Sequence, residues 1–158
     1  MSQVLSTQTL GVRSFAALLR AHASATRLLN AQLMADHGLT INDYEVLLRL
    51  ARAPEQRMRR VDLADQVLLT ASGITRLLDG LERGGFVERG SCATDRRVVH
   101  AVLTPTGLEK VQEASASHLA QVDELFRERF ADQELEAVAA LLEKLGDSAP
   151  AESCEPAD

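Results

Sequence analysis

The chain of 158 residues has no tryptophan, a single tyrosine and an aromatic share of only 3%. Since hydrophobic residues make up 46% of it, a core must be built mainly from Leu, Val and Ala, a composition that favours helices. No apolar run reaches the roughly 18 to 20 residues that span a bilayer. Residues 1–10 have neither a basic head nor an apolar signal core. We therefore expect one domain in the cytoplasm, with no membrane partner.

Motifs for catalysis, metal binding or cofactor binding are also missing. The sequence contains no glycine-rich phosphate loop, no nucleophile elbow and no paired Cys or His ligands. Cys92 and Cys154 lie far apart, so neither a structural disulfide nor a zinc site is expected. We expect no catalytic residues, no metal site and no cofactor, and therefore no enzyme.

Charge is unevenly divided along the chain, whose formal net charge is −6. Residues 1–104 hold 13 basic and 10 acidic side chains, a net +3, whereas residues 105–158 hold 4 and 13, a net −9. Binding of nucleic acid depends on the local field at the contact face, and salt screens charges beyond about 10 Å. The acidic C-terminal part does not exclude DNA binding, although a solvated acidic helix explains the same asymmetry.

Hydrophobic periodicity predicts a series of helices interrupted by one hairpin. Gly38 ends a long amphipathic helix, Thr40 and Asp43 form a variant of the capping box, and Thr70 caps a further helix that ends at Gly84. The expected segments are helices over about 12–35, 40–50, 61–67 and 70–84, an extended piece at 57–60, a hairpin of 86–89 with 98–103, and two C-terminal helices.

This order predicts a mainly α fold with a small β wing, in which a winged helix-turn-helix is attached to a helical dimerisation region. We expect the following parts: 1–38 as the N-terminal dimerisation helix, 39–104 as the DNA-binding lobe, 105–146 as the C-terminal dimerisation helices and 147–158 as a disordered tail. The long outer helices are too apolar on one side for the lobe to cover alone, so we expect a homodimer.

The helix that begins after Thr70 has the pattern of a recognition helix. Its apolar residues Ile74, Leu77, Leu78 and Leu81 form one inward stripe, although Gly80 weakens the helix by about 1 kcal/mol relative to Ala. The residues that face away near the N-terminus are Ala71, Ser72, Thr75 and Arg76. Hydroxyls can reach phosphates or base edges, a methyl group can contact thymine, and an arginine fork can bind guanine. An ordinary polar helix face has the same pattern, so this helix alone does not distinguish a DNA-contacting surface from a solvated one.

The hairpin loop supplies the second part of the pattern, because it reads Thr94, Asp95, Arg96, Arg97. A basic tip beside a recognition helix suits the minor groove, whose narrow stretches concentrate negative potential. We expect Asp95 to orient an arginine fork rather than to approach phosphate. The order helix, turn, helix, hairpin favours this interpretation over a merely soluble hairpin tip.

Several linked motifs resemble the MarR family of bacterial transcription regulators. They are Val61-Asp62-Leu63-Ala64, Ile74-Thr75-Arg76-Leu77-Leu78-Asp79-Gly80-Leu81, Gly85-Phe86-Val87-Glu88-Arg89, Asp95-Arg96-Arg97 and Leu103-Thr104-Pro105-Thr106-Gly107. The resemblance implies a two-fold dimer that places two recognition helices in major grooves and two wing tips in minor grooves of an inverted repeat of double-stranded DNA. It also implies that a small aromatic or anionic effector binds between the dimerisation frame and the lobe and weakens DNA binding.

Two residues are candidates for contacting such an effector. His22 lies on the first helix and Tyr44, an amphipathic ring, on the second. His22 can also be an ordinary surface or partly buried residue, and Tyr44 can equally be a core residue. A different function also remains open, because winged helices serve as protein-docking modules, and the acidic balance suits a domain without specific DNA binding.

Overall fold

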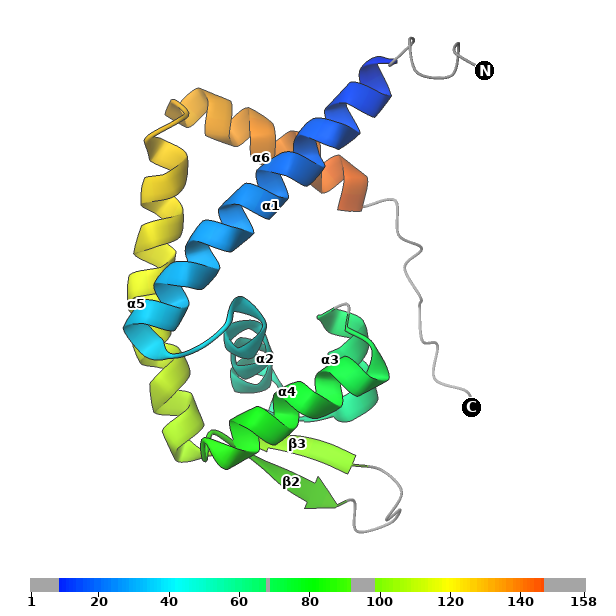
Figure 1. Cartoon of the computed structure of the whole chain (residues 1–158), viewed down its shortest axis with the longest axis vertical. Coiled ribbons are helices and arrows are strands. Elements are labelled where there is room, and N and C mark those ends of the chain that lie inside the picture. Colours follow the sequence, from blue (N-terminus) through cyan, green and yellow to red (C-terminus); the bar gives the residue numbers. More distant parts are fainter. Residues whose placement is uncertain (1–8, 68, 92–98, 147–158) are drawn as a thin grey trace. The chain divides into compact units, whose positions relative to one another are not determined.

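The computed structural model describes residues 9–67, 69–91 and 99–146. In chain order its elements are α1 (Leu10–His37), α2 (Ile41–Arg52), the 3-10 turn η1 (Pro54–Gln56), β1 (Arg57–Arg59), α3 (Arg60–Gln66), α4 (Ala71–Arg83), β2 (Val87–Ser91), β3 (Val99–Leu103), α5 (Pro105–Arg127) and α6 (Asp132–Gly146) (Figure 1). The expected mainly α fold with a small β wing is confirmed. Two compact units divide inside α5, between Ala120 and Gln121. The expected tail at 147–158 lies outside the described residues.

Local side-chain chemistry explains where the helices begin and end. Gly38, with φ +67°, ends α1 in the left-handed conformation that glycine adopts without strain. The backbone N–H of Asp43 donates to the Thr40 hydroxyl, and the Asp43 carboxylate accepts from the Thr40 N–H, which completes the predicted capping box. The Thr70 hydroxyl accepts from the Gly73 N–H at 3.1 Å, so α4 begins where the sequence predicted.

The β-strands form one antiparallel sheet in the order β1-β3-β2. Val87 pairs with Leu103 in the predicted hairpin. The extended piece before α3 adds a third strand, with Arg57 opposite Val102. The strand β1 therefore ties the start of α3 to β3 of the hairpin, with Arg59 opposite His100.

The core of the N-terminal unit gathers residues from α1 to α5. Leu33, Leu47, Leu63, Ile74 and Val111 are each at most 2% exposed. Each belongs to a different helix, so one apolar core holds α1 to α5 against the sheet. The buried residues of α4, which are Ile74, Leu78 and Leu81, all belong to its predicted hydrophobic stripe.

The junction between the hairpin and α5 is closely packed. The Thr104 hydroxyl donates to the Gly85 carbonyl at 2.7 Å and accepts from the Gly107 N–H at 3.0 Å. A Cβ on Gly107 would lie 2.0 Å from the carbonyl oxygen of Phe86, so only glycine fits there. The first turn of α5 is thus fixed directly to the backbone that precedes β2.

The second unit contains α6, which buries none of its own residues. Leu141, Leu142 and Leu145 are 60%, 44% and 65% exposed. Within the part of the chain that the structure describes, no helix has the length and apolar character needed to cross a membrane.

Candidate nucleic-acid interface

The helices α3 and α4 meet through a short turn. The Leu69 N–H donates to the Ala64 carbonyl at 2.9 Å, which closes the end of α3, and Thr70 then opens α4. Leu63 on α3 packs in the same core as Ile74 and Leu81 on α4, so the orientation of the helix pair is set by buried contacts.

One face of α4 is open to solvent. Thr70, Ala71, Ser72 and Arg76 are exposed, while Ile74 and its neighbours on the opposite face are buried. The Ser72 hydroxyl lies 3.2 Å from that of Thr70. Arg76 has no hydrogen bond or ion pair with any residue that the structure describes. Its charge and donors therefore have no partner within the described chain.

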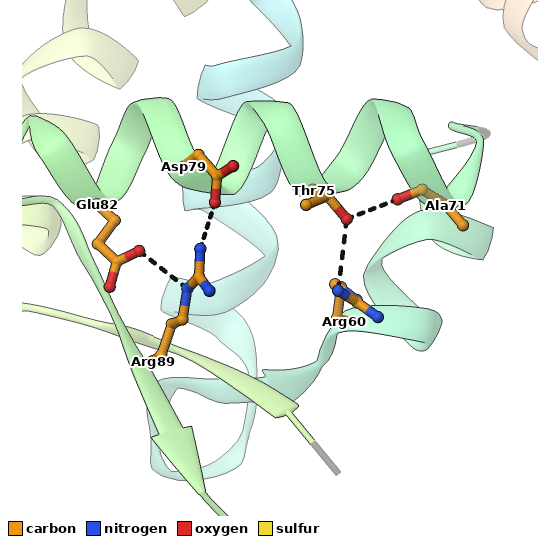
Figure 2. Close-up of polar contacts among 6 residues, drawn as sticks. All are labelled: Arg60, Ala71, Thr75, Asp79, Glu82 and Arg89. Carbon is orange, nitrogen blue, oxygen red and sulfur yellow. Dashed lines mark hydrogen bonds and ion pairs between the residues drawn. The ribbon is translucent and has the colours of Figure 1, made fainter. Parts of the chain in front are cut away.

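Thr75 lies on the flank of α4 between these two faces and is half-buried. Its hydroxyl donates to the Ala71 carbonyl at 2.7 Å, and Nη1 of Arg60 donates to the same hydroxyl at 3.4 Å (Figure 2). The hydroxyl that the sequence predicted to reach DNA is therefore already engaged within the chain, and Arg60 lies next to it.

Farther along this flank, Arg89 of β2 links the hairpin to α4. Its Nε donates to the Glu82 carboxylate at 2.9 Å, and its Nη2 binds the Asp79 carboxylate (Figure 2). The Arg89 side chain is 59% exposed, so solvent screens the pairs and each adds little to stability. Their geometric effect is larger, because two carboxylates one helical turn apart hold a single guanidinium.

A small hollow of about 50 Å³ lies between α4 and the sheet. Arg60, Thr75, Asp79, Glu82 and Arg89 all line it. The polar flank of α4 therefore faces the hairpin, whereas Ser72 and Arg76 lie on the exposed face. The predicted wing residues Asp95, Arg96 and Arg97 lie outside the described residues.

Tyr44, one of the two candidate effector residues, is buried in a polar cluster between α2 and α5. Its ring packs edge-on against His118 with centroids 4.7 Å apart. The Ser115 hydroxyl donates to the Val111 carbonyl, so the Tyr44 hydroxyl, 3.1 Å away, donates to Ser115. Burial, and then the proximity of His37, lower the pKa of His118.

His22, the other candidate, is exposed on α1. Within the described part of the chain no hydrogen bond or ring contact joins it to Tyr44. The histidine that packs against Tyr44 is His118, from α5. The same cluster contains His37, whose Nε2 lies 2.6 Å from the Ser117 hydroxyl.

Sequence reasoning missed two arginines of this region, Arg60 and Arg89. A signal for the first was present, since Arg57, Arg59 and Arg60 give three basic residues in four positions. Arg89 was placed only inside a motif of the family resemblance. Both contacts connect separate elements, α3 with α4 and β2 with α4, and local spacing does not reveal such pairings.

A helix-turn-helix followed by a β-hairpin, with longer helices before and after it in the chain, defines the winged helix-turn-helix class of proteins. The family model described as MarR family matches residues 37–98. The crystal structure of AbsC, a MarR family transcriptional regulator from Streptomyces coelicolor, is similar with a TM-score of 0.73 and 31% identity, over 89% of this chain and 95% of that one. The chain belongs to the MarR family and is a transcription regulator rather than an enzyme.

Curated relatives agree with this assignment. The HTH-type transcriptional regulator MhqR of Bacillus subtilis is 28% identical over 135 residues, which are 85% of this chain and 90% of that protein. The HTH-type transcriptional repressor YetL of Bacillus subtilis is 30% identical over 108 residues, which are 68% of this chain and 64% of that protein. A MarR family regulator from Streptomyces coelicolor, solved in complex with DNA, shares the fold with a TM-score of 0.81 at 24% identity, over 95% of each chain.

Proposed function

We propose that this protein is a homodimeric regulator that binds an inverted repeat in double-stranded DNA, with α4 of each subunit in a major groove. The observation that carries the proposal is the contrast between the two faces of α4. Ile74, Leu78 and Leu81 are buried in the core, while Ala71, Ser72 and Arg76 are exposed. A recognition helix needs this division, because its N-terminal residues contact base edges while the helix stays anchored in its own domain.

In this proposal Thr70, Ala71, Ser72, Thr75 and Arg76 form the major-groove surface. Since the Thr75 hydroxyl is engaged with Ala71 and Arg60, its methyl group and neighbouring Arg76 supply the base contacts. The wing residues Asp95, Arg96 and Arg97 enter the minor groove, with Asp95 orienting an arginine. The half-sites then lie about one helical turn, or roughly 10 base pairs, apart.

Exposed apolar side chains support the proposed homodimer. On α1, Leu10, Phe15 and Leu19 are 75%, 61% and 52% exposed. The leucines of α6 are similarly uncovered. Apolar surface in contact with water is unfavourable by about 25 cal/mol per Å², so a second copy that covers these helices is stabilising. Residues 1–38 and 105–146 then make the dimerisation region around a lobe at 39–104.

The proposed mode of action is repression relieved by a small aromatic or anionic effector, in the cytoplasm, where a regulator meets chromosomal DNA. Such an effector must bind the conformation that does not bind DNA more tightly, and DNA then weakens the effector by the same factor. His22 and Tyr44 are its proposed contacts. Unchanged affinity for an aromatic acid in the double variant His22→Ala, Tyr44→Ala, measured by calorimetry, would remove these residues from the proposal.

The test of DNA binding is footprinting of the purified protein on DNA upstream of its own coding region, with affinity measured over a salt series. Protection of an inverted repeat and a steep loss of affinity with salt are expected, because each bound phosphate releases counterions. Arg96→Ala is expected to weaken binding to most sequences, whereas Arg76→Ala changes which sequence is preferred. An absence of protection together with a flat salt dependence would favour the protein-docking alternative.

A further inference from the structure

The start of α3 carries three arginines that differ in how their charges are used. Nε and Nη2 of Arg59 donate to the two carboxylate oxygens of Asp62 at 2.7 and 2.8 Å. Nη1 of Arg57 lies 3.6 Å from the Glu55 carboxylate. Arg60 has no carboxylate within 4.0 Å among the residues that the structure describes. Of the three, Arg60 is the cation without an anionic partner in the described chain.

The contact that Arg60 does make uses little of its bonding capacity. Nη1 donates to the Thr75 hydroxyl over 3.4 Å, a long bond to a neutral acceptor. A guanidinium has five N–H donors in a fixed plane, so at least four remain. Arg60 is also half-buried, and partial burial of a charge is unfavourable without an anion nearby. Both facts leave Arg60 able to bind an anion that comes from outside the chain.

The position of Arg60 indicates what that anion is. Its bond to Thr75 places the guanidinium beside the first turns of α4, next to the surface proposed to enter the major groove (Figure 2). The two acidic residues of α4 that line the same hollow as Arg60, Asp79 and Glu82, are paired with Arg89. Their charges therefore repel an approaching anion less than two unpaired carboxylates would.

We infer that Arg60 binds a backbone phosphate of the DNA, at the edge of the groove that α4 occupies. This inference rests on the proposed function. The planar fork of the guanidinium matches the geometry of two phosphate oxygens, and Thr75 holds the fork in place. Arg60 fixes the position of the subunit on the duplex and carries no sequence information of its own.

The experiment compares four proteins on a fluorescent duplex of the upstream DNA: the wild type, Arg60→Gln, Arg60→Lys and Arg59→Gln. Glutamine keeps a donor for Thr75 but removes the charge, whereas lysine keeps the charge. Arg59→Gln is the matched control, because it removes a charge of the same sign one residue away that Asp62 already neutralises. Affinity is measured by anisotropy over a salt series, and circular dichroism verifies the fold of each variant.

For Arg60→Gln we expect roughly tenfold weaker binding at moderate salt and a slope of log affinity against log salt that is smaller by about 1. Arg60→Lys should keep most of the slope, and Arg59→Gln should match the wild type. The inference is wrong if Arg60→Gln keeps the wild-type slope. It is also wrong if Arg60→Gln binds DNA and Arg60→Lys does not, because Arg60 then acts only by positioning Thr75. If the wild type itself shows no salt-dependent binding, the proposed function fails instead.

Discussion

The leucines of the central lobe and those of α6 have opposite environments. Leu47, Leu50 and Leu63 are 0% exposed, whereas Leu141 and Leu145 are 60% and 65% exposed. Burial of a leucine side chain contributes about 1.5–3 kcal/mol. The lobe obtains this stabilisation within one chain, and α6 does not. The difference teaches that the helix-turn-helix belongs to a core completed within one chain, whereas α6 has an apolar face exposed to solvent.

The largest effect is expected for truncation inside the lobe. Leu47→Ala should lower the free energy of unfolding by about 2–5 kcal/mol, because the side chain is fully enclosed and the cavity it leaves cannot close. Urea denaturation followed by circular dichroism measures the loss. A loss below about 1 kcal/mol would mean that the lobe is packed no better than α6, and the contrast between the two regions would disappear.

The matching change on α6 should affect assembly rather than folding. Leu145→Glu puts a charge on the exposed apolar face, and we expect it to weaken the proposed homodimer about 100-fold, or about 2.7 kcal/mol, while the helical content is retained. Sedimentation velocity over a dilution series reads the dissociation constant. Glu143→Gln, on the same helix, serves as the control. An unchanged dissociation constant for Leu145→Glu would place the dimer interface elsewhere.

Two glycines inside helices extend the comparison to single backbone positions. Gly107→Ala should destabilise the protein by about 1–3 kcal/mol, because the added Cβ meets the Phe86 carbonyl oxygen and overpacking forces the backbone to shift. Gly80→Ala should stabilise α4 by roughly 0.5–1 kcal/mol, since its Cβ would have nothing within 4 Å. Thermal unfolding of the two variants side by side tests both signs. Two shifts of the same sign would contradict this account.

The smallest effect concerns pH. Burial lowers the pKa of His118 in the folded protein below its ordinary value of 6.5. As pH falls below 6.5 the unfolded chain takes up a proton first, so stability is present above that pH and is lost as pH falls toward the lower folded-state pKa. His118→Gln should therefore lose less stability between pH 7.5 and about 5.5 than the wild type. Urea midpoints of both proteins at three pH values measure this loss of stability. An equal loss in His118→Gln and the wild type would disprove the prediction.

Local chemistry made much of the fold predictable. The Thr40 and Thr70 caps, the Gly38 end and the inward stripe of α4 are fixed by residues within one turn of each other, and the structure confirms them. The family resemblance was equally accessible, because its motifs are continuous in sequence. The assignment of Ala71, Ser72 and Arg76 to DNA contact stays a prediction, although all three are exposed.

Contacts between elements were not predictable in the same way. Asp79 on α4 binds Arg89, which comes from the strand after the helix. Arg60 reaches Thr75 across 15 positions, and Tyr44 reaches Ser115 across 71. Such pairs depend on how helices and strands are oriented in three dimensions. The spacing of residues along one helix or strand does not specify that orientation.

The close approach of Gly107 to the Phe86 carbonyl has a mechanical consequence. With Thr104 bonded to Gly85 on one side and to Gly107 on the other, α5 has no flexible joint at its base. The first turn of α5 and the backbone that precedes β2 are therefore expected to move together. In the proposed homodimer, a shift of this first turn of α5 would therefore also move the hairpin.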